Sequence, residues 1–203
     1  MLNRNVPRLR FSEFKDEWVK STLKEYTEIN PKNQELPNKF IYIDLESVDS
    51  GLLKEKRTIT KEDAPSRAQR ILMKNDILYQ TVRPYQKNNF YFDFEGSNYV
   101  ASTGYAQLRT TQNSQFLYQL LHTEKFVNEV LSKCTGTSYP AINSTDLAKI
   151  KIKTCSITEQ NKISSFLTQI DTKIELLKKQ YQNFTNFKKF LMQNLFTQKL
   201  RFT

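Results

Sequence analysis

Three polar stretches carry the side chains that could do chemistry, and the chemistry they suit is binding. They are Thr81–Asn89, Ala101–Arg109 and Thr135–Leu147. Their guanidinium, amide and hydroxyl groups can contact phosphates or base edges. Each stretch alone also suits an ordinary surface turn, so the interpretation depends on all three together. The candidate contact residues, with Arg83 first among them, are Arg83, Tyr85, Gln86, Lys87, Ser102, Thr103, Tyr105, Arg109, Thr137, Ser138, Tyr139 and Asn143.

The motifs of catalysis and of metal binding are missing from the sequence. The four glycines are isolated from one another, so no Gly-rich loop can cradle a nucleotide phosphate. Asp93 and Glu95 fall on one face of a predicted strand without the spaced lysine of a nuclease site. His122 has no nucleophile or carboxylate arranged around it, which indicates a structural role. We therefore expect no catalytic residue, no metal site and no cofactor in this chain.

Composition favours an anionic partner. Lys and Arg number 31 against 21 Asp and Glu, which leaves a net charge of +10. The 10 tyrosines and 14 phenylalanines interleave with these basic residues. No apolar run approaches the roughly 18 residues of a membrane span, so nucleic acid is favoured over membrane. Cys134 and Cys155 are too few for a disulfide framework, which fits a reducing cytoplasm.

The elements that must position these residues indicate an α+β fold with a mainly antiparallel sheet. β-Branched and aromatic runs predict strands, and helical spacing of apolar residues predicts helices. Between them, the charged segment Lys54–Arg70 is expected to be exposed. The predicted strands are Phe40–Leu45, Ile77–Val82, Phe90–Phe94, Tyr99–Leu108 and the short run Ile150–Ile152; the predicted helices are Trp18–Tyr26 and Ser114–Lys133.

The last quarter of the chain, Ser156–Leu200, predicts one long helix. Every Gly and Pro lies at or before Pro140, and Ser156 with Glu159 has the spacing of a capping box. Its apolar residues follow the 4-3 spacing of a helix that packs lengthwise against other helices. This seam consists of Ile163, Leu167, Ile170, Ile174, Leu177, Tyr181, Phe184, Leu191 and Leu195, with Lys188 as its one charged position.

Four of these segments, in this order, resemble the specificity subunit of Type I restriction-modification systems. They are Lys74–Pro84 (KNDILYQTVRP), Tyr99–Arg109 (YVASTGYAQLR), Gly136–Ile152 (GTSYPAINSTDLAKIKI) and Ile157–Gln180 (ITEQNKISSFLTQIDTKIELLKKQ). The linker Lys153–Gln160 departs from the Pro-rich pattern of the family. The resemblance implies a target recognition domain over residues 1–155, a conserved spacer helix over 156–200, and a tail, 201–203, that is similar to the start of a second repeat.

The resemblance also implies a function. It describes a half-length, non-catalytic subunit that binds double-stranded DNA and directs adenine methyltransferase and restriction subunits to one half of a bipartite target. S-adenosylmethionine, ATP and Mg²⁺ would then belong to those partner subunits, and two copies would pair through the long helix. The alternative is an assembly protein whose helix joins partners and whose basic surface is incidental.

Overall fold

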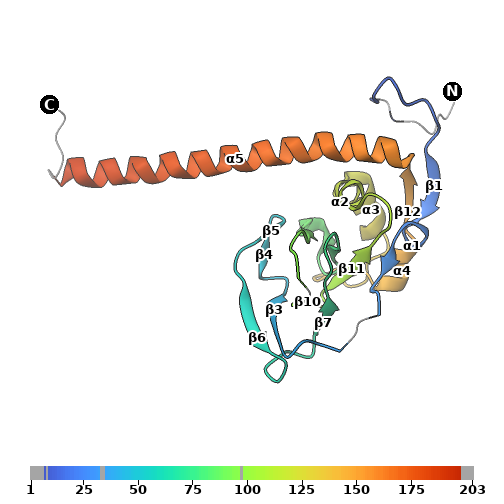
Figure 1. The fold of residues 1–203 in the computed structure, drawn as a ribbon, viewed down its shortest axis with the longest axis horizontal. Helices are drawn as coiled ribbons and strands as arrows, with labels where there is room; N and C mark the ends of the chain where they lie inside the picture. Colours follow the sequence, from blue (N-terminus) through green and yellow to red (C-terminus); the bar gives the residue numbers. More distant parts are fainter. Residues whose placement is uncertain (1–6, 8, 33–34, 97, 198–203) are drawn as a thin grey trace. The chain divides into compact units, whose positions relative to one another are not determined.

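The computed structural model describes residues 7, 9–32, 35–96 and 98–197, and its fold is α+β (Figure 1). The chain divides into two compact units, Met1–Lys162 and Ile163–Thr203. The first six residues of the long helix therefore group with the first unit. The functional boundary expected at residue 155 stays a prediction.

Two four-stranded sheets build the first unit, where the sequence indicated one. Only β3 and β10 pair in parallel, and the other neighbours within the two sheets are antiparallel. One sheet has the order β6 (Arg57–Thr60), β3 (Lys39–Ile43), β10 (Tyr99–Ser102) and β7 (Ala68–Ile71). The other has the order β2 (Glu28–Ile29), β11 (Tyr105–Arg109), β8 (Ile77–Gln80) and β9 (Phe90–Tyr91).

Two short ribbons complete the strands. β1 (Val19–Thr22) pairs antiparallel with β12 (Lys151–Thr154), so the two ends of the first unit lie side by side (Figure 1). β4 (Val48–Asp49) pairs with β5 (Leu52–Leu53). The strand expected near Ile150 is therefore real, but it pairs outside the two larger sheets.

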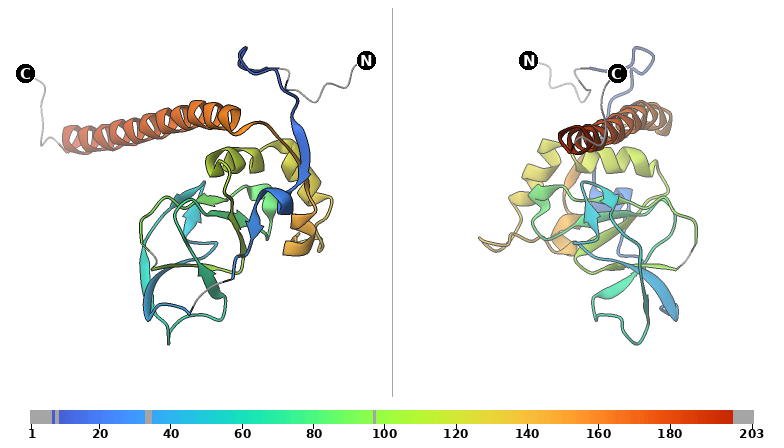
Figure 2. Two further views of the ribbon diagram at one scale, coloured as in Figure 1. Left: turned by 45° about the vertical axis from the view of Figure 1, so that its right-hand side comes forward. Right: turned by 90° about the vertical axis from the view of Figure 1, so that its left-hand side faces the viewer.

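Short helices with polar N-caps connect the strands. α2 and α3 pack beside the β11 sheet (Figures 1 and 2), where the rings of Tyr79 and Phe126 meet edge to face at 5.7 Å. Asn113 and Asn143 accept the backbone N–H of the third residue on, at 2.7 and 2.8 Å. The helices of this unit are α1 (Leu23–Tyr26), the 3-10 turn η1 (Pro84–Gln86), α2 (Ser114–Leu121), α3 (Glu124–Leu131) and α4 (Ser144–Ala148).

Three predicted elements were wrong in their extent. The run Tyr99–Leu108 is two strands in different sheets, because the chain turns at Thr103 and Gly104. The helix Ser114–Lys133 is broken after His122, where the Thr123 hydroxyl accepts the Phe126 N–H and starts α3. Trp18–Tyr26 begins as a strand rather than a helix, and its helical part is one turn long.

Two further predictions need correction. Lys54–Arg70 contains β6 and β7, so it is not a simple exposed segment. The strand expected over Phe90–Phe94 covers only its first two residues. Phe92 is nevertheless fully buried in the main core, together with Ile43, Leu72 and Leu78. A hydrophobic pattern thus located the core here without defining the strand.

The long helix α5 runs from Ile157 to Phe196, a length of ~60 Å at 1.5 Å per residue. It begins and ends close to the predicted Ser156 and Leu200, the latter lying outside the described residues along with the predicted tail 201–203. Only half of the capping box forms: the Ser156 hydroxyl accepts the Glu159 N–H at 3.4 Å, while the Glu159 carboxylate binds Arg10. Among the described helices none is both long and apolar enough to span a bilayer.

Candidate nucleic-acid interface

The three polar stretches meet at Thr81, where β8 ends. Its N–H and its hydroxyl both donate to the Gly104 carbonyl, at 3.1 and 2.8 Å. Its own carbonyl accepts the Ile142 N–H at 3.0 Å. An isolated bridge between Val82 and Ala141 extends the contact. Residues far apart in the sequence therefore form one surface, which we call the three-loop surface and define as residues 81–89, 101–109 and 135–143.

Arg83 occupies the centre of the contact between two of these loops. Its N–H donates to the Pro140 carbonyl at 2.7 Å, and its guanidinium carbon lies 4.0 Å from the centroid of the Tyr139 ring. Its φ of 54° is the left-handed conformation, which non-glycine residues adopt at a cost. Within the described residues its Nε has no hydrogen-bond partner. Stacking on Tyr139 orients the guanidinium. Because Nε is buried, an acceptor outside the chain would be met by the Nη groups.

The turn after Arg83 presents an aromatic ring and an amide. Tyr85 is 49% exposed, and Gln86 is exposed although its Oε1 accepts from Gln80 Nε2 at 2.8 Å. Lys87 forms an ion pair with Glu124 of α3. That pair lies at the surface, where ion pairs contribute little to stability, so a phosphate could compete for the lysine.

The third loop is the most exposed part of the three-loop surface. Thr137, Ser138 and Tyr139 are all exposed, and Tyr139 retains 64% of its accessible area. Paired N–H···O bonds of 2.9 Å between Thr135 and Ala141 close the base of the loop. Gly136 has a φ of +86°, which a side chain would strain. The loop therefore holds its hydroxyl and phenol groups towards solvent on a fixed base.

Residues 101–109, the middle stretch of the three-loop surface, are mostly buried beneath that surface. Tyr105 is fully buried in the main core, and Ser102 is buried in β10. The Thr103 N–H donates to the Arg67 carbonyl at 2.9 Å, and its side chain is partly exposed. The full burial of Tyr105 does not fit the DNA contact expected of it. Ser102 borders a surface hollow, and its contact role stays a prediction.

Arg109 and Asn143 have structural partners. The Arg109 Nε and Nη2 donate to the two carboxylate oxygens of Asp76 at 2.8 and 2.7 Å. Asp76 is fully buried and also accepts from Gln107 Nε2 and from the Met73 N–H, at 2.7 Å each. This ion pair raises the pKa of Arg109. Asn143 caps α4, so both residues have structural roles, and the contact role expected of them stays a prediction.

Sequence reasoning missed the arginines of β6, β7 and the loop before β7. Arg57 and Arg67 line a hollow of about 490 Å³ together with Tyr42 and three acidic residues. Arg70 is half-buried, and burial lowers the pKa of its guanidinium. Its Nε has no hydrogen-bond partner among the described residues. Burial keeps that Nε from an acceptor outside the chain, so the exposed Arg57 and Arg67 are the candidates for an anion here. The charged composition of Lys54–Arg70 was the signal for them.

His122 has hydrogen-bond partners on both ring nitrogens. The His122 Nδ1 lies 2.7 Å from the Tyr118 carbonyl, so it donates there, and Nε2 then accepts from Asn89 Nδ2 at 3.3 Å. Both ring nitrogens serve the fold, as expected. In the part of the chain that the structure describes, no group of three or more His, Cys, Asp or Glu side chains could hold a metal ion.

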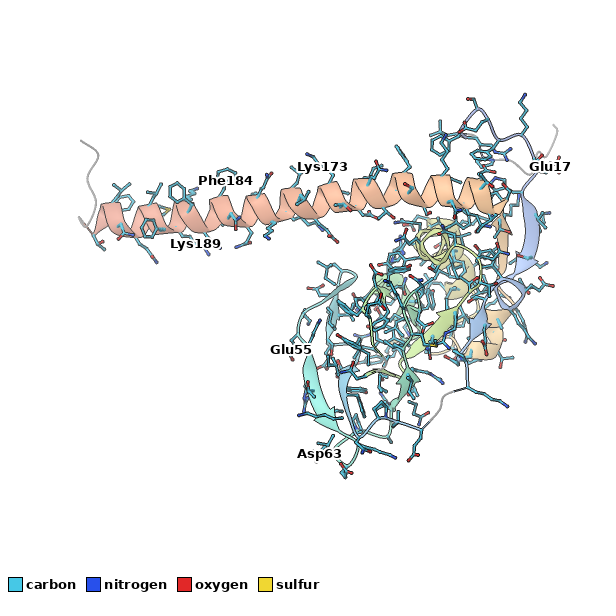
Figure 3. The ribbon with its side chains drawn as sticks, in the orientation of Figure 1. Glu17, Glu55, Asp63, Lys173, Phe184 and Lys189 are labelled. Carbon is cyan, nitrogen blue, oxygen red and sulfur yellow. The ribbon has the colours of Figure 1, made fainter. Side chains whose placement is uncertain are left out.

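The α5 helix carries a row of exposed apolar side chains. Tyr181 and Phe184 are each 72% exposed, and Ile170, Ile174 and Leu177 are between 42% and 51% exposed. Figure 3 shows Phe184 standing out from the ribbon, with Lys173 and Lys189 elsewhere along the helix. The remaining seam residues, Ile163, Leu167, Leu191 and Leu195, are partly exposed.

Known proteins share this combination of elements. The chain is 27% identical over 147 residues to the HindI specificity subunit of Haemophilus influenzae, which covers 70% of this chain and 29% of that protein. It is 35% identical over 89 residues to the MjaVIII specificity subunit of Methanocaldococcus jannaschii, covering 44% and 21%. The HsdS crystal structure from Thermoanaerobacter tengcongensis superposes with a TM-score of 0.67 at 26% identity, covering 90% and 50%.

These matches define what the chain is similar to and how much of each relative it spans. The matched part spans about half of that crystallised subunit and under a third of each curated relative. The family model of the Type I restriction modification DNA specificity domain matches residues 15–186, which include the three-loop surface and most of α5. The chain therefore belongs to the Type I restriction modification DNA specificity domain family.

Proposed function

We propose that this chain is a non-catalytic recognition subunit that binds one half of a bipartite double-stranded DNA target. The observation that carries the proposal is the three-loop surface, where the Arg83 guanidinium stacks on the exposed ring of Tyr139 and the ring of Tyr85 is also exposed. The net charge of +10 supplies phosphate attraction and counterion release. Loop side chains then supply the discrimination between base sequences.

The exposed seam of α5 supports a homodimer. In an antiparallel pair with full overlap, Ile163 faces Leu195 of the second copy, and Leu177 faces Tyr181. Each layer then joins the two classes of core position, which is the pairing that buries the seam. A twofold dimer would hold two recognition domains and read inverted half-sites. Lys188 faces Ile170 in this register and helps to fix it.

A second apolar ridge supports a different partner. Leu176 and Phe190 are more than half exposed and lie roughly 100° around α5 from the neighbouring seam residues, at 3.6 residues per turn. A helix dimer that buries the seam would leave this ridge uncovered. We assign it to the adenine methyltransferase subunit, with the restriction subunit recruited to the same complex. S-adenosylmethionine, ATP and Mg²⁺ would be bound by those subunits.

The recognition proposal is tested by Arg83→Ala. Methylome sequencing of cells that carry this chain and its methyltransferase first gives the target sequence. Fluorescence anisotropy then compares the target with a random duplex over a range of salt. We expect at least a tenfold loss on the target and a smaller loss on random DNA, because a base contact is worth about 1–3 kcal/mol. Equal losses would make Arg83 a phosphate contact, and no loss would remove it from the site.

The matched control is Lys20→Ala, which removes a positive charge from an exposed position of β1 outside the three loops. It should leave the ratio of target to random affinity unchanged. If the unmodified chain shows no salt-dependent DNA binding, with or without methyltransferase subunits, the assembly-protein alternative would be favoured instead.

The dimer is tested by Leu177→Lys. This change places a lysine in both central layers of the antiparallel pair, so sedimentation should show a monomer at concentrations where the unmodified chain is dimeric. Asn186→Lys introduces the same charge on the far side of α5 and should leave the dimer intact. A monomeric unmodified chain at micromolar concentration would refute the twofold arrangement.

A further inference from the structure

The first turn of α5 holds the segment that precedes β1. Arg10 donates from Nε to Glu159 Oε1 and from Nη2 to Oε2, both at 2.7 Å, and Nη2 also donates to the Asp16 carbonyl at 2.6 Å. The two side chains are only 12% and 1% exposed. This is a bidentate pair, the geometry that distinguishes arginine from lysine. The pair lowers the pKa of Glu159.

Two further side chains complete this binding site. Trp18 Nε1 donates to Glu159 Oε1 at 3.4 Å. Lys162 forms an ion pair with Glu13 and places its Nζ 4.8 Å from the centroid of the Phe11 ring. We call Trp18, Glu159 and Lys162 the arginine clamp. It contacts an arginine and the phenylalanine that follows it, whereas Leu9 is 92% exposed.

A second segment of the chain has the chemistry that the clamp accepts. Residues 8–12 read Arg-Leu-Arg-Phe-Ser, and residues 199–203 read Lys-Leu-Arg-Phe-Thr. Each of the five positions keeps its residue or its chemical class. Arg201 and Phe202 correspond to Arg10 and Phe11, the two residues that the clamp contacts. The second segment lies outside the described residues, so the match is one of sequence.

The geometry of the proposed dimer brings this segment to the clamp of the other copy. In the antiparallel seam, residue 163 faces 195, 170 faces 188 and 177 faces 181, so each pair of numbers sums to 358. If the same register is continued in residue number, 199 of one copy would correspond to Glu159 of the other, which would bring residues 199–203 near the clamp. This step rests on the proposed homodimer, while the chemistry of the clamp does not.

We propose that the arginine clamp is a docking site for an Arg-Phe segment, and that residues 199–203 of a second copy bind it in exchange with residues 8–12. Arg201 would then form the bidentate pair with Glu159. Two such exchanges, related by the twofold axis, would fasten both ends of the helix pair.

Trp18 is the single tryptophan of the chain and donates to Glu159 within the clamp, so its fluorescence reports occupancy of the clamp. The variant Arg10→Ala/Arg201→Ala vacates the clamp and removes its competitor. At a concentration where it is monomeric, the peptide Lys-Leu-Arg-Phe-Thr should shift Trp18 emission in a saturable manner. The peptide Lys-Leu-Ala-Phe-Thr, or the further change Glu159→Gln, should weaken binding at least tenfold. Two peptides that act alike would overturn the proposal.

A second measurement leaves Arg10 in place, in case its loss unfolds the domain. Arg201→Ala in the otherwise unmodified chain should raise the dissociation constant of the dimer at least threefold, and Arg201→Lys should give an intermediate value, because lysine cannot pair bidentately. Lys199→Ala, which removes a charge from the same segment, should have a smaller effect. No change with Arg201→Ala would overturn the exchange.

The peptide-binding experiment and the dimer-dissociation experiment together distinguish failure of this inference from failure of the proposed dimer. A chain that sediments as a monomer but binds the arginine peptide would overturn exchange between copies and keep the docking site. A dimer that ignores both the peptide and Arg201→Ala would overturn the clamp and leave the dimer standing.

Discussion

Replacing Arg109 by alanine should destabilise the first unit and leave DNA discrimination unchanged. Arg109 gives Asp76 two of its four hydrogen bonds, and Asp76 is fully buried. Each bond to a charged group is worth about 1.5–3 kcal/mol. Gln107 and the Met73 N–H would still hold the carboxylate, and Arg109 is 30% exposed. We therefore expect a loss of about 3 kcal/mol, at the lower end of the range for breaking a buried pair.

Thermal unfolding followed by calorimetry measures this loss. For a domain of this size, about 3 kcal/mol corresponds to a fall in Tm of about 6–12 °C. The double change Asp76→Asn/Arg109→Leu should recover part of the stability, because it removes the buried charge together with its partner. Arg83→Ala is the matched control and should melt within about 1 kcal/mol of the unmodified chain, because no ion pair engages its side chain within the described residues.

DNA binding below the melting transition completes the test. Arg109→Ala should bind the target and a random duplex with the ratio of affinities of the unmodified chain. A variant that melts normally but loses preference for the target would refute the reasoning. It would also restore Arg109 to the contact surface.

Three further predictions concern positions that the structure reassigns. Asn143→Ala removes the cap of α4 and should cost about 1 kcal/mol in chemical unfolding, whereas Asn143→Asp should cost less than half of that. Tyr105→Ala should cost about 3–5 kcal/mol as a core truncation, while Tyr105→Phe, which removes only a 3.5 Å bond to the Asp44 carbonyl, should leave stability and DNA affinity nearly unchanged. For Glu159 the pKa lies below the ordinary 4.5, so the stability that its charge confers is fully present above pH 4.5 and is lost as pH falls through the lowered value. The difference in unfolding free energy between the unmodified chain and Glu159→Gln should hence be constant from pH 6 to 8 and shrink in acid; a difference that grows in acid would contradict this sign.

Local signals predicted the parts of the fold whose cause is local. The α5 helix follows from a seam repeated every seven residues and from the absence of Gly and Pro after residue 140. The loops follow from Gly, Pro and Asn at the ends of buried runs. The turn at Thr103 and Gly104 was missed, because β10 and β11 are both largely buried and their sequence reads as one continuous apolar strand.

Most features of the candidate site that the sequence did not predict depend on partners that are distant in the sequence. Arg109 follows a strand and a polar turn, as Arg83 does, and nothing local marks its pairing with a carboxylate 33 residues away. Likewise, Glu159 has the spacing of a capping residue, yet Arg10 takes its carboxylate from 149 residues away. The sequence could therefore identify candidate arginines for the interface. It could not distinguish those that pair with a carboxylate of the chain from those that do not.

The different environments of Arg109 and Arg83 underlie the proposed role of the three-loop surface in recognition. A buried carboxylate fixes Arg109 beneath the sheet, and the resulting pair helps to hold β8 and β11 in register, with Tyr105 facing Gln80. β8 ends at Gln80, next to Thr81, so a rigid register sets where all three loops meet. Arg83 can then adopt a strained backbone conformation against Tyr139, with no ion pair to its side chain within the described residues. Arg109 therefore has a structural role in fixing the strands. That fixed framework is what allows Arg83 to discriminate between bases in the proposed complex.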